Sequence, residues 1–531
     1  MAAKLKRKRD SQAKFGKFTF ALLCLMLLVA LMLAYVMRSG PTPFWDDEDY
    51  VGYAYLLLNG KFTLTGNPFN PLVGVFNYSF LTIFGVSLFI WLLGPSVFAA
   101  TLASLLEYLA LIAVTFLLAR KLLNDIIALV ASMFVMVSPV ILPYTTRILP
   151  DLPLALIASL SLLAFFISKD IKGRKGYLAY FLTGLLIGLT IYVRLDGTIF
   201  VVLAAISIFF WMGRRMRLKK FLFLIFGITV AFAFYFGIIF VGTHNPFASL
   251  IALTVSNPTT LYDNLNFAIN YLFNPFFNYS PSPLANYHMV QYPTGPIIFE
   301  AVLCSIIVFA KKDRIWPLAL LNLGLALFYL FGSSKISYYA PILLLDVFFT
   351  ILIPFSSILA AYLIFLVYVA IKKYSGLLAV AVFILLLCIT IMFSVIPDIS
   401  IYSPNVAIRN FIKLYGNALH YTMNVSSGRN ITIFTQGDSP YNYQLLAWLI
   451  TGGNKSVQAI PINLSVPCAF KPDSFVIIAS VNYTPLTPSE YLNETLLWAG
   501  NTCALERLKT IILNQDYPIN ISVYRIDATP H

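Results

Sequence analysis

Residues 18–50 are FTFALLCLMLLVALMLAYVMRSGPTPFWDDEDY, an apolar run over 18–37 and, eight residues later, four consecutive carboxylates from Asp46 to Asp49. A run of roughly 20 apolar residues crosses about 30 Å of hydrocarbon as a helix. Adjacent carboxylates this close to a bilayer repel one another and are costly to desolvate. The cluster is therefore a candidate general base at a membrane surface, and a solvated acidic loop is the alternative.

The whole chain has the composition of a polytopic membrane protein. Of its 531 residues, 59% are apolar and only 11% are charged, which excludes a soluble globular protein. Eleven apolar runs predict membrane-spanning helices, near 18–37, 95–119, 125–142, 152–168, 177–193, 197–213, 221–241, 295–310, 315–331, 338–371 and 376–396. The tenth run is too long for one simple crossing, so we expect it to begin as a helix in the outer interface.

The basic residues follow the membrane topology and do not indicate a nucleic-acid partner, although the net charge is +14. Seven Lys and Arg precede residue 18, and more recur at every second connection between runs. These positions hold 23 of the 36 Lys and Arg, whereas the opposite loops hold five. Because cytoplasmic loops are enriched in Lys and Arg, the N-terminus is predicted to be cytoplasmic. The first run has no small-residue cleavage site, which predicts a retained anchor.

Eleven crossings from a cytoplasmic start place the C-terminal tail outside a plasma membrane or an ER-type membrane. We expect a basic segment at 1–17, a transmembrane domain at 18–396 and a small extracytoplasmic α/β domain at 397–531. All nine Asn-x-Ser/Thr glycosylation sequons fall on the predicted outer side: Asn77, Asn278, Asn424, Asn430, Asn454, Asn463, Asn482, Asn493 and Asn520. Cys468 and Cys503 also lie in this tail, where an exterior pair could form a disulfide.

Local patterns predict further elements outside the spans. In the first outer loop, 49–58 and 78–93 predict helices that lie along the membrane surface, because treating 78–93 as a crossing would move every later basic loop outside. The tail predicts strands at 431–434 and 475–478 and helices at 441–449 and 491–508.

Two cations on the predicted outer side stand next to carboxylates. Arg147 precedes Asp151 in a proline-containing stretch between the third and fourth runs. Either a structural Arg147–Asp151 ion pair or a substrate contact fits this spacing. Arg194 lies with Asp196 in the tight turn between the fifth and sixth runs, and such a turn needs polar residues in any protein.

Two further candidates lie in later outer segments. Lys335 is close to Tyr338 and Tyr339 at the start of the tenth run. It either anchors the chain at the interface or binds a lipid phosphate through a charge-assisted contact. His288 lies in the second large outer loop, where it either contacts a phosphate or an acceptor or has a structural role.

Together these residues place a base and separate cations beside the bilayer on one side of the membrane. Transfer of a group from a phospholipid-like donor to a hydroxyl acceptor fits this arrangement. The carboxylate would deprotonate the acceptor, and the cations would stabilise the leaving phosphate. The five Cys and four His have no metal-ligand spacing.

The first outer loop resembles a known family. Its pattern Asp46-Asp47-x2-Tyr50-x3-Ala54, followed by Asn59-Gly60, resembles the Asp-Glu-x2-Tyr-x3-Ala motif of GT-C glycosyltransferases. The similarity is greatest to the branch that contains protein O-mannosyltransferases and lipid A aminoarabinose transferases. Segments resembling later motifs of that family follow in its order, at 70–72, 138–151, 194–197 and 335–341. Two departures are Asp in place of Glu at position 47 and the absence of Trp-Trp-Asp-Tyr-Gly, which argues against an oligosaccharyltransferase.

The resemblance implies an inverting transferase that moves a sugar, such as mannose, from a polyprenyl (dolichyl) phosphate to a hydroxyl on a glycoprotein or lipid-linked glycan. It implies that Asp46 is the catalytic base and that Asp47 orients it or the acceptor. The enzyme would be metal-independent or at most metal-assisted, and a divalent cation on these two carboxylates stays open. The expected substrate-binding residues are Tyr50, Arg147, Asp151, Arg194, Asp196, His288, Lys335, Tyr338 and Tyr339.

A transporter or flippase of lipid-linked glycans is the alternative function. Such a protein is expected to carry paired charges near the middle of the bilayer. Here the ionisable residues gather at one membrane surface, and Glu107 within the second run is the main exception. This distribution favours an enzyme.

Overall fold

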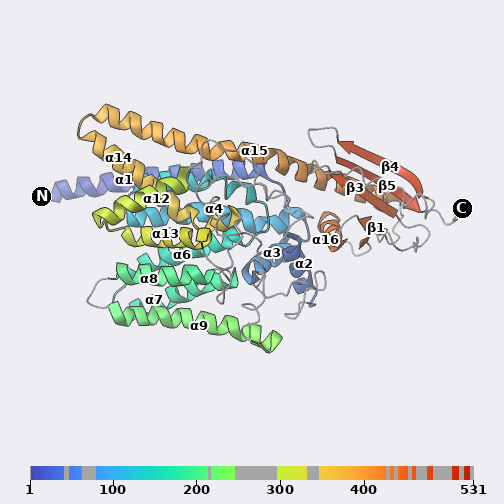
Figure 1. Ribbon diagram of the computed structural model, residues 1–531, viewed down its shortest axis with the longest axis horizontal. Coiled ribbons are helices and arrows are strands. Elements are labelled where there is room, and N and C mark those ends of the chain that lie inside the picture. The colour runs from blue at the N-terminus through green and yellow to red at the C-terminus, as the bar shows by residue number, and fades with distance from the viewer. Residues whose placement is uncertain are drawn as a thin grey trace.

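The computed structural model describes residues 2–40, 47–61, 79–195, 197–212, 217–245, 296–331, 346–425, 431–435, 440–452, 457–461, 475–481, 505–513 and 519–526. Its helices form an elongated bundle, and the strands lie beyond one end of that bundle (Figure 1). We call this end, where α2 (Asp47–Leu58), α3 (Phe80–Leu93) and α16 (Pro440–Ile450) lie, the α2 end.

Each of the eleven predicted apolar runs coincides with a helix of the bundle. These helices are α1 (Ala2–Met37), α4 (Val97–Leu122), α5 (Asp125–Met136), α6 (Asp151–Asp170), α7 (Gly173–Gly188), α8 (Gly197–Trp211), α9 (Arg217–Thr243), α12 (Pro296–Lys311), α13 (Trp316–Phe331), α14 (Ile353–Lys372) and α15 (Gly376–Val425). Short 3₁₀ helices add η2 (Leu142–Tyr144), η3 (Leu189–Tyr192) and η6 (Asp346–Ile351). The described part of the tenth run is therefore η6 followed by α14.

Seven helices in the described residues are long and apolar enough to cross a membrane: 18–37 of α1, α4, α6, 173–192 across α7 and η3, 218–241 of α9, α14, and 376–395 of α15. Four shorter apolar helices accompany them, namely α3, α5, α8 and α13. Many large apolar side chains face outward, such as Phe20 at 64% exposure and Leu377 at 84%. Lipid is the solvent that suits such a surface.

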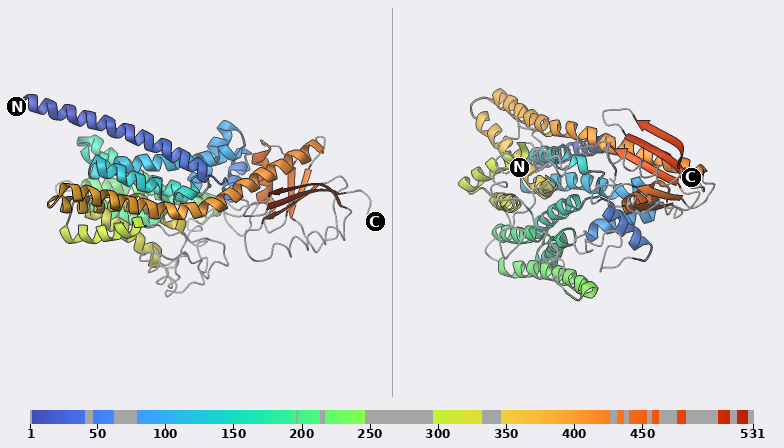
Figure 2. Two further views of the ribbon diagram at one scale, coloured as in Figure 1. Left: turned by 90° about the horizontal axis from the view of Figure 1, so that it is seen from above. Right: turned by 45° about the vertical axis from the view of Figure 1, so that its right-hand side comes forward.

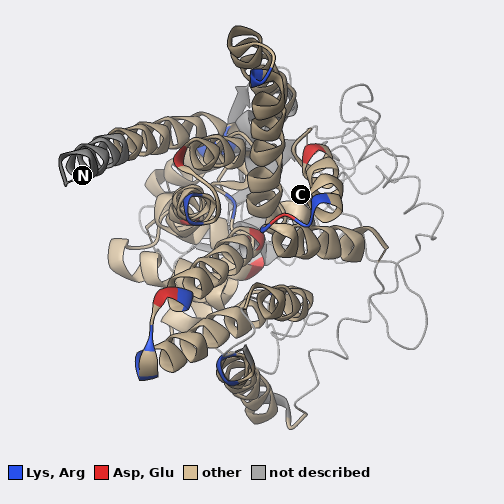
Figure 3. Ribbon diagram, turned by 90° about the vertical axis from the view of Figure 1, so that its left-hand side faces the viewer, with Lys and Arg blue, Asp and Glu red and all other residues tan. Residues whose placement is uncertain are grey.

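In the described residues, Lys and Arg are concentrated at the helix ends opposite the α2 end. Arg120 pairs with Asp125 and Lys121 with Asp170 there. Figure 3 looks along the bundle from this side and shows Lys and Arg at turns and helix ends, with largely uncharged ribbon between them.

Glycines let α7 and α9 approach each other closely. A Cβ on Gly184 would lie 2.0 Å from the Leu224 carbonyl oxygen, and one on Gly227 would lie 2.1 Å from the Phe181 oxygen. Gly188, one turn after Gly184, faces Ala231 in the same way. Small residues four apart are the usual means by which membrane helices bring their backbones together.

Helix α15 connects the bundle to the strands. It begins near the end opposite α2, runs beside α14 and α12, and continues to contact β3 and β5 (Figure 2). Residue 397, where the tail was expected to begin, lies inside this continuous helix. The helix bends along its length (Figure 2), and Pro397 and Pro404 lie within it. Interior prolines remove a backbone hydrogen bond and kink a helix.

Two small sheets follow α15. Strands β1 (Ile431–Thr435) and β2 (Val457–Pro461) pair in parallel, and the order of the second sheet is β3-β5-β4, all antiparallel. These three strands are β3 (Phe475–Val481), β4 (Leu505–Leu513) and β5 (Ile519–Ile526). The strands predicted at 431–434 and 475–478 and the helix at 441–449 correspond to β1, β3 and α16.

The helix predicted over 491–508 is wrong at its end. Residues 505–508 open strand β4, whose register runs along β5 from Leu505 opposite Ile526 to Leu513 opposite Ile519. Leu, Glu and Arg favour a helix locally, but β5, which begins six residues after β4 ends, supplies backbone hydrogen bonds instead. Residues 491–504 lie outside the described residues.

Candidate active site

The first turn of α2 places a carboxylate inside the protein. Asp47 is the first residue of α2 and is fully buried. Its Oδ2 accepts hydrogen bonds from Arg147 Nε at 2.7 Å and Arg147 Nη2 at 2.5 Å. Its Oδ1 accepts from the backbone N–H of Ile148 at 2.5 Å. Both carboxylate oxygens are thus held by one short segment, a hundred residues further along the chain.

The apolar face of α2 explains why the helix sits there. Tyr50, Val51, Tyr53 and Ala54 are buried at helical spacing and share one core cluster with residues of α3. Burial raises the pKa of Tyr53, and the negative charge of Asp49 adds to this effect. The phenol therefore stays protonated at any physiological pH. The acidic residues at the start of α2 also suit the positive end of the helix dipole.

A second ion pair lies next along the same segment. Asp151 begins α6 and accepts a hydrogen bond from Arg194 Nη1 at 2.5 Å. The Asp151 side chain is 8% exposed and that of Arg194 is 20% exposed, so Arg194 reaches the protein surface. Residues 147–151 consequently link α2 on one side to the turn after η3 on the other.

The structure therefore pairs the charges differently from the simplest sequence interpretation. An Arg147–Asp151 ion pair was one reading of that stretch, but Arg147 bonds Asp47 and Asp151 bonds Arg194. A spacing of four residues places two side chains on one face of a helix, but an irregular segment does not impose this arrangement. Arg147 lies in the irregular segment before α6, so its side chain takes another direction.

The chain that leads into α2 is tied to the same segment at its other end. The backbone N–H of Ser39, just after α1, donates to Thr146 Oγ1 at 3.0 Å. Asp47 then bonds Arg147 and Ile148. Residues 146–148 thus hold the chain on both sides of 41–46, the stretch that contains Asp46. Nothing in the sequence pattern singled out Thr146 or the Ile148 backbone, because their role depends on a contact a hundred residues away.

Several predicted residues lie outside the described part of the chain. These are Asp46, Asp196, His288, Lys335, Tyr338, Tyr339, Cys468 and Cys503, with the sequon residues Asn77, Asn278, Asn430, Asn454, Asn463, Asn482 and Asn493. Of the remaining sequon residues, Asn424 is exposed at the end of α15 and Asn520 lies in β5. The structure thus joins Asp47 to Arg147 and Asp151 to Arg194, and Tyr50 lies about one turn after Asp47 on α2.

A divalent cation on Asp46 and Asp47 stays an open prediction, because Asp46 lies outside the described residues. No group of three or more His, Cys, Asp and Glu among them is placed to hold an ion. Asp47 also has both oxygens engaged by Arg147 and Ile148. A cation on Asp47 would lie beside the positive charge of Arg147, which repels it.

One buried carboxyl within the bundle was not anticipated. Thr390 Oγ1 of α15 donates to Glu300 Oε1 of α12 at 2.6 Å, while Glu300 Oε2 is buried without a hydrogen-bond partner in the described structure. Carboxyls inside membrane helices are functional candidates by default. The Glu300 carboxyl lies between α12 and α15 and is not part of either ion pair.

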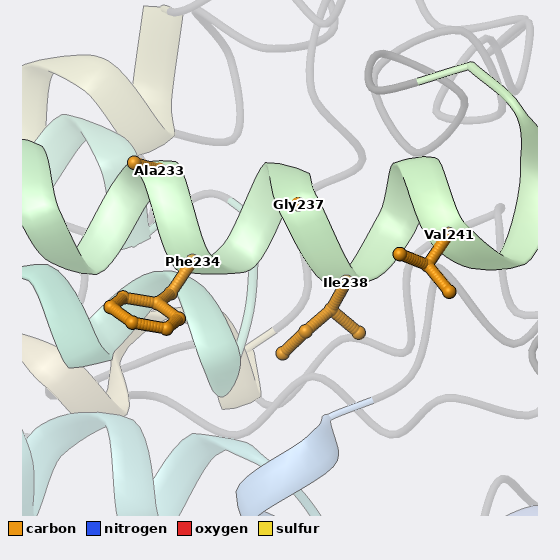
Figure 4. Close-up of a pocket in the computed structure, with 5 residues that line it drawn as sticks. All are labelled: Ala233, Phe234, Gly237, Ile238 and Val241. Atoms are coloured by element: carbon orange, nitrogen blue, oxygen red, sulfur yellow. The ribbon is translucent and has the colours of Figure 1, made fainter.

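An apolar cavity of about 510 Å³ lies along α9. Its described lining residues are Ala233, Phe234, Gly237, Ile238 and Val241, and Figure 4 shows Phe234, Ile238 and Val241 pointing to one side of the helix. None of these residues is ionisable. This described lining suits a hydrocarbon chain.

Comparison with known proteins identifies the fold. Residues 78–239 match the family model of dolichyl-phosphate-mannose-protein mannosyltransferase. The structure is similar to ArnT from Cupriavidus metallidurans in the apo state, with a TM-score of 0.58, 12% identity, and 97% of this chain and 98% of that chain covered. The chain has the GT-C fold. No curated protein matches it.

A second solved structure supports the same fold. ArnT from C. metallidurans bound to undecaprenyl phosphate matches with a TM-score of 0.50 and 15% identity, covering 95% of this chain and 97% of that chain. The resemblance to the GT-C superfamily, and to its mannosyltransferase and aminoarabinose transferase branch, is confirmed. The family match extends from just before α3 into α9 and so includes Arg147, Asp151 and Arg194.

Proposed function

We propose that this protein is an integral-membrane glycosyltransferase that uses a polyprenyl-phosphate-linked sugar, such as mannose, and an acceptor hydroxyl. The observation that carries the proposal is the buried contact between the start of α2 and residues 147–148. It holds Asp47, the second of the four consecutive carboxylates, at the α2 end of the bundle. The bound undecaprenyl phosphate in the similar ArnT structure supports a lipid-linked donor.

In the proposed reaction Asp46 is the general base and Asp47 is a positioning residue. Asp46 takes the proton from the acceptor hydroxyl, whose oxygen forms a bond to the anomeric carbon of the sugar. The bond from that carbon to the phosphate oxygen breaks with inversion, and its electron pair leaves with the polyprenyl phosphate. Asp47 cannot readily serve as the base, because Arg147 and the Ile148 N–H hold both of its oxygens.

Cations would stabilise the leaving phosphate. Arg194 is the best described candidate, since its partly exposed guanidinium is oriented by Asp151. We propose Lys335 as a second contact, with Tyr338 and Tyr339 beside it. Fixed positive charge aimed at a developing phosphate is an effective form of catalysis because it needs no reorganisation during the reaction.

The proposed topology has eleven crossings, a cytoplasmic N-terminus and an extracytoplasmic α2 end. The basic residues at the opposite helix ends support this orientation, because cytoplasmic ends carry the excess of Lys and Arg. Residues after α15 would form a glycosylated α/β domain that helps to select a glycoprotein or lipid-linked acceptor.

The distribution of ion pairs favours this function over a flippase. In the described residues, the Asp47–Arg147 and Asp151–Arg194 pairs lie at the α2 end, and the pairs of Arg120 and Lys121 lie at the other end. A transporter is expected to have such pairs near the middle of the bilayer.

The test follows radiolabelled hexose as it leaves a polyprenyl phosphate in membranes that contain the protein. We expect Asp46→Asn to slow release by about 10²- to 10⁴-fold, the usual contribution of a general base. Asp170→Asn is the matched control, since it removes a carboxylate at the opposite end of the bundle. Unchanged release by Asp46→Asn would refute its role as the base, and no release by the wild-type protein would refute the transferase.

A further inference from the structure

Helix α16, which follows β1 in the chain, packs against α2. Leu445, Trp448 and Leu449 of α16 are buried in the same cluster as Tyr50 and Tyr53 of α2. The Trp448 ring meets the ring of Tyr55 in an edge-to-face arrangement, with centroids 5.0 Å apart and an interplanar angle of 82°. This geometry is the favoured one for aromatic pairs.

The opposite side of α16 is also in contact with the protein. Ile450 Cγ2 lies 3.3 Å from the position that a Cβ on Gly416 of α15 would occupy. Leu446 and Ala447 are buried as well. The helix is therefore wedged between α15 and α2, as its position beside α2 in Figure 1 also indicates.

Helix α2 thus packs against two helices from distant parts of the chain. On one side α2 packs against α3 of the bundle, and on the other it packs against α16, almost 400 residues further along. Helix α2 has only 12 residues, and Tyr55 lies about 12 Å along its axis from Asp47. A rigid helix of this length transmits the position of Tyr55 to its first turn.

We propose that Trp448 is a positioning residue for catalysis, which acts through Tyr55 to hold α2 and thereby the acidic motif at its start. This inference rests on the proposed transferase function and deepens it. Residues after the last predicted crossing would then be part of the catalytic unit, in addition to any role in choosing the acceptor. Small displacements of a catalytic group reduce rates strongly, by about 10²-fold for 1 Å.

The experiment measures the steady-state kinetics of the purified full-length protein with a labelled polyprenyl-phosphate hexose. We expect Trp448→Ala to lower kcat about 10- to 100-fold, with the KM for the donor changed less than about twofold, because the donor contacts remain. Trp448→Phe retains an aromatic ring against Tyr55 and should recover most of the rate. Trp91→Ala is the control, since Trp91 of α3 is 70% exposed.

A second variant tests the proposal if Trp448→Ala does not fold. Trp448→Leu fills much of the same apolar space but removes the edge-to-face contact, so it should fold and still show the reduced kcat. Hydrogen–deuterium exchange of the α2 amides should be faster in Trp448→Ala and in Trp448→Leu than in the wild-type protein, whereas exchange in α8 should not change.

The outcomes separate this inference from the proposed function. A wild-type kcat in both Trp448→Ala and Trp448→Leu would overturn the positioning role. An equal loss of kcat in the Trp91→Ala control would also overturn the positioning role, because removing any tryptophan would then have the same effect. If the wild-type protein releases no sugar, the transferase function fails, and unchanged exchange of the α2 amides would separately show that α16 does not hold α2.

Discussion

A single buried ion pair joins two of the sequence motifs in this protein. The Arg147 side chain is 7% exposed and that of Asp47 is not exposed at all. Such a pair gives little net stability compared with apolar residues, but the loss of one partner leaves a buried charge uncompensated. The pair therefore holds the first turn of α2 against residues 147–148.

We predict that Arg147→Ala destabilises the protein by about 3–5 kcal/mol and abolishes sugar transfer. Arg147→Lys keeps the charge but loses the planar fork that bonds Asp47 through Nε and Nη2, so it should recover only part of the stability. The free energy of unfolding is measured by chemical denaturation in detergent. Arg120→Ala, which removes a pair at 45% and 18% exposure, should change it by only about 0–1 kcal/mol. Equal effects of Arg147→Ala and Arg120→Ala would contradict this account.

The residue scale also shows where pattern reasoning succeeds. The spacing of apolar residues over 49–58 predicted a short helix, and α2 is present there as Asp47–Leu58. The pairing of Arg147 with Asp47 was not predictable, because nothing local connects two residues a hundred positions apart. A sequence shows which charged residues need an ion-pair partner when they are buried, but it does not show which residue that partner is.

At the scale of elements, close helix contacts depend on the absence of side chains. Helices α7 and α9 meet where Gly184, Gly188 and Gly227 leave backbone exposed to backbone. The hydrophobic effect cannot drive association between helices that lipid also solvates, so van der Waals packing has to do so.

We predict that Gly184→Val separates α7 from α9, because even a Cβ would lie 2.0 Å from the Leu224 carbonyl oxygen, a rigid backbone atom. The expected result is a loss of folded protein, measured by size-exclusion chromatography and thermal unfolding in detergent. Gly237→Ala is the matched control on α9, because its added Cβ meets no atom of another described element within 4 Å. It should be neutral or stabilising by about 0.5–1 kcal/mol, since alanine favours a helix. A folded, stable Gly184→Val protein would show that this contact is not required.

Elements with strong periodicity were predicted well, and those that depend on partners were not. The helices of the bundle follow from long apolar runs, because a buried or lipid-facing helix satisfies its backbone by itself. Strand β4 was predicted in part as a helix, since its hydrogen bonds come from β5. A strand is stable only with its neighbour, which local propensity does not reveal.

At the scale of the whole molecule, α15 provides a direct test of the proposed orientation. Its 50 residues span about 75 Å, so one helix crosses the bundle and continues to the strands. Tyr374 just before it is 90% exposed, and Asn424 at its other end is also exposed. Both positions are therefore accessible to reagents.

We predict that a membrane-impermeant maleimide labels Asn424→Cys in intact cells but labels Tyr374→Cys only after permeabilisation. Each cysteine is introduced into a variant whose five native cysteines are replaced by alanine. The physical reason is the excess of Lys and Arg at the Tyr374 end of the bundle, which favours the cytoplasm. The reverse labelling pattern would place the α2 end, and with it the proposed reaction, inside the cell.

The sequence alone determined that this is a membrane protein with many helices, the approximate position of each apolar helix of the bundle, and the motifs that resemble GT-C transferases. These properties are local, because apolar length and charge at helix ends are set by the bilayer. Only the tertiary structure decided that Arg147 pairs with Asp47, that Arg194 pairs with Asp151, and that α16 packs on α2. These contacts join segments separated by about 40 to 400 residues, and which of many possible contacts form depends on how the helices pack together.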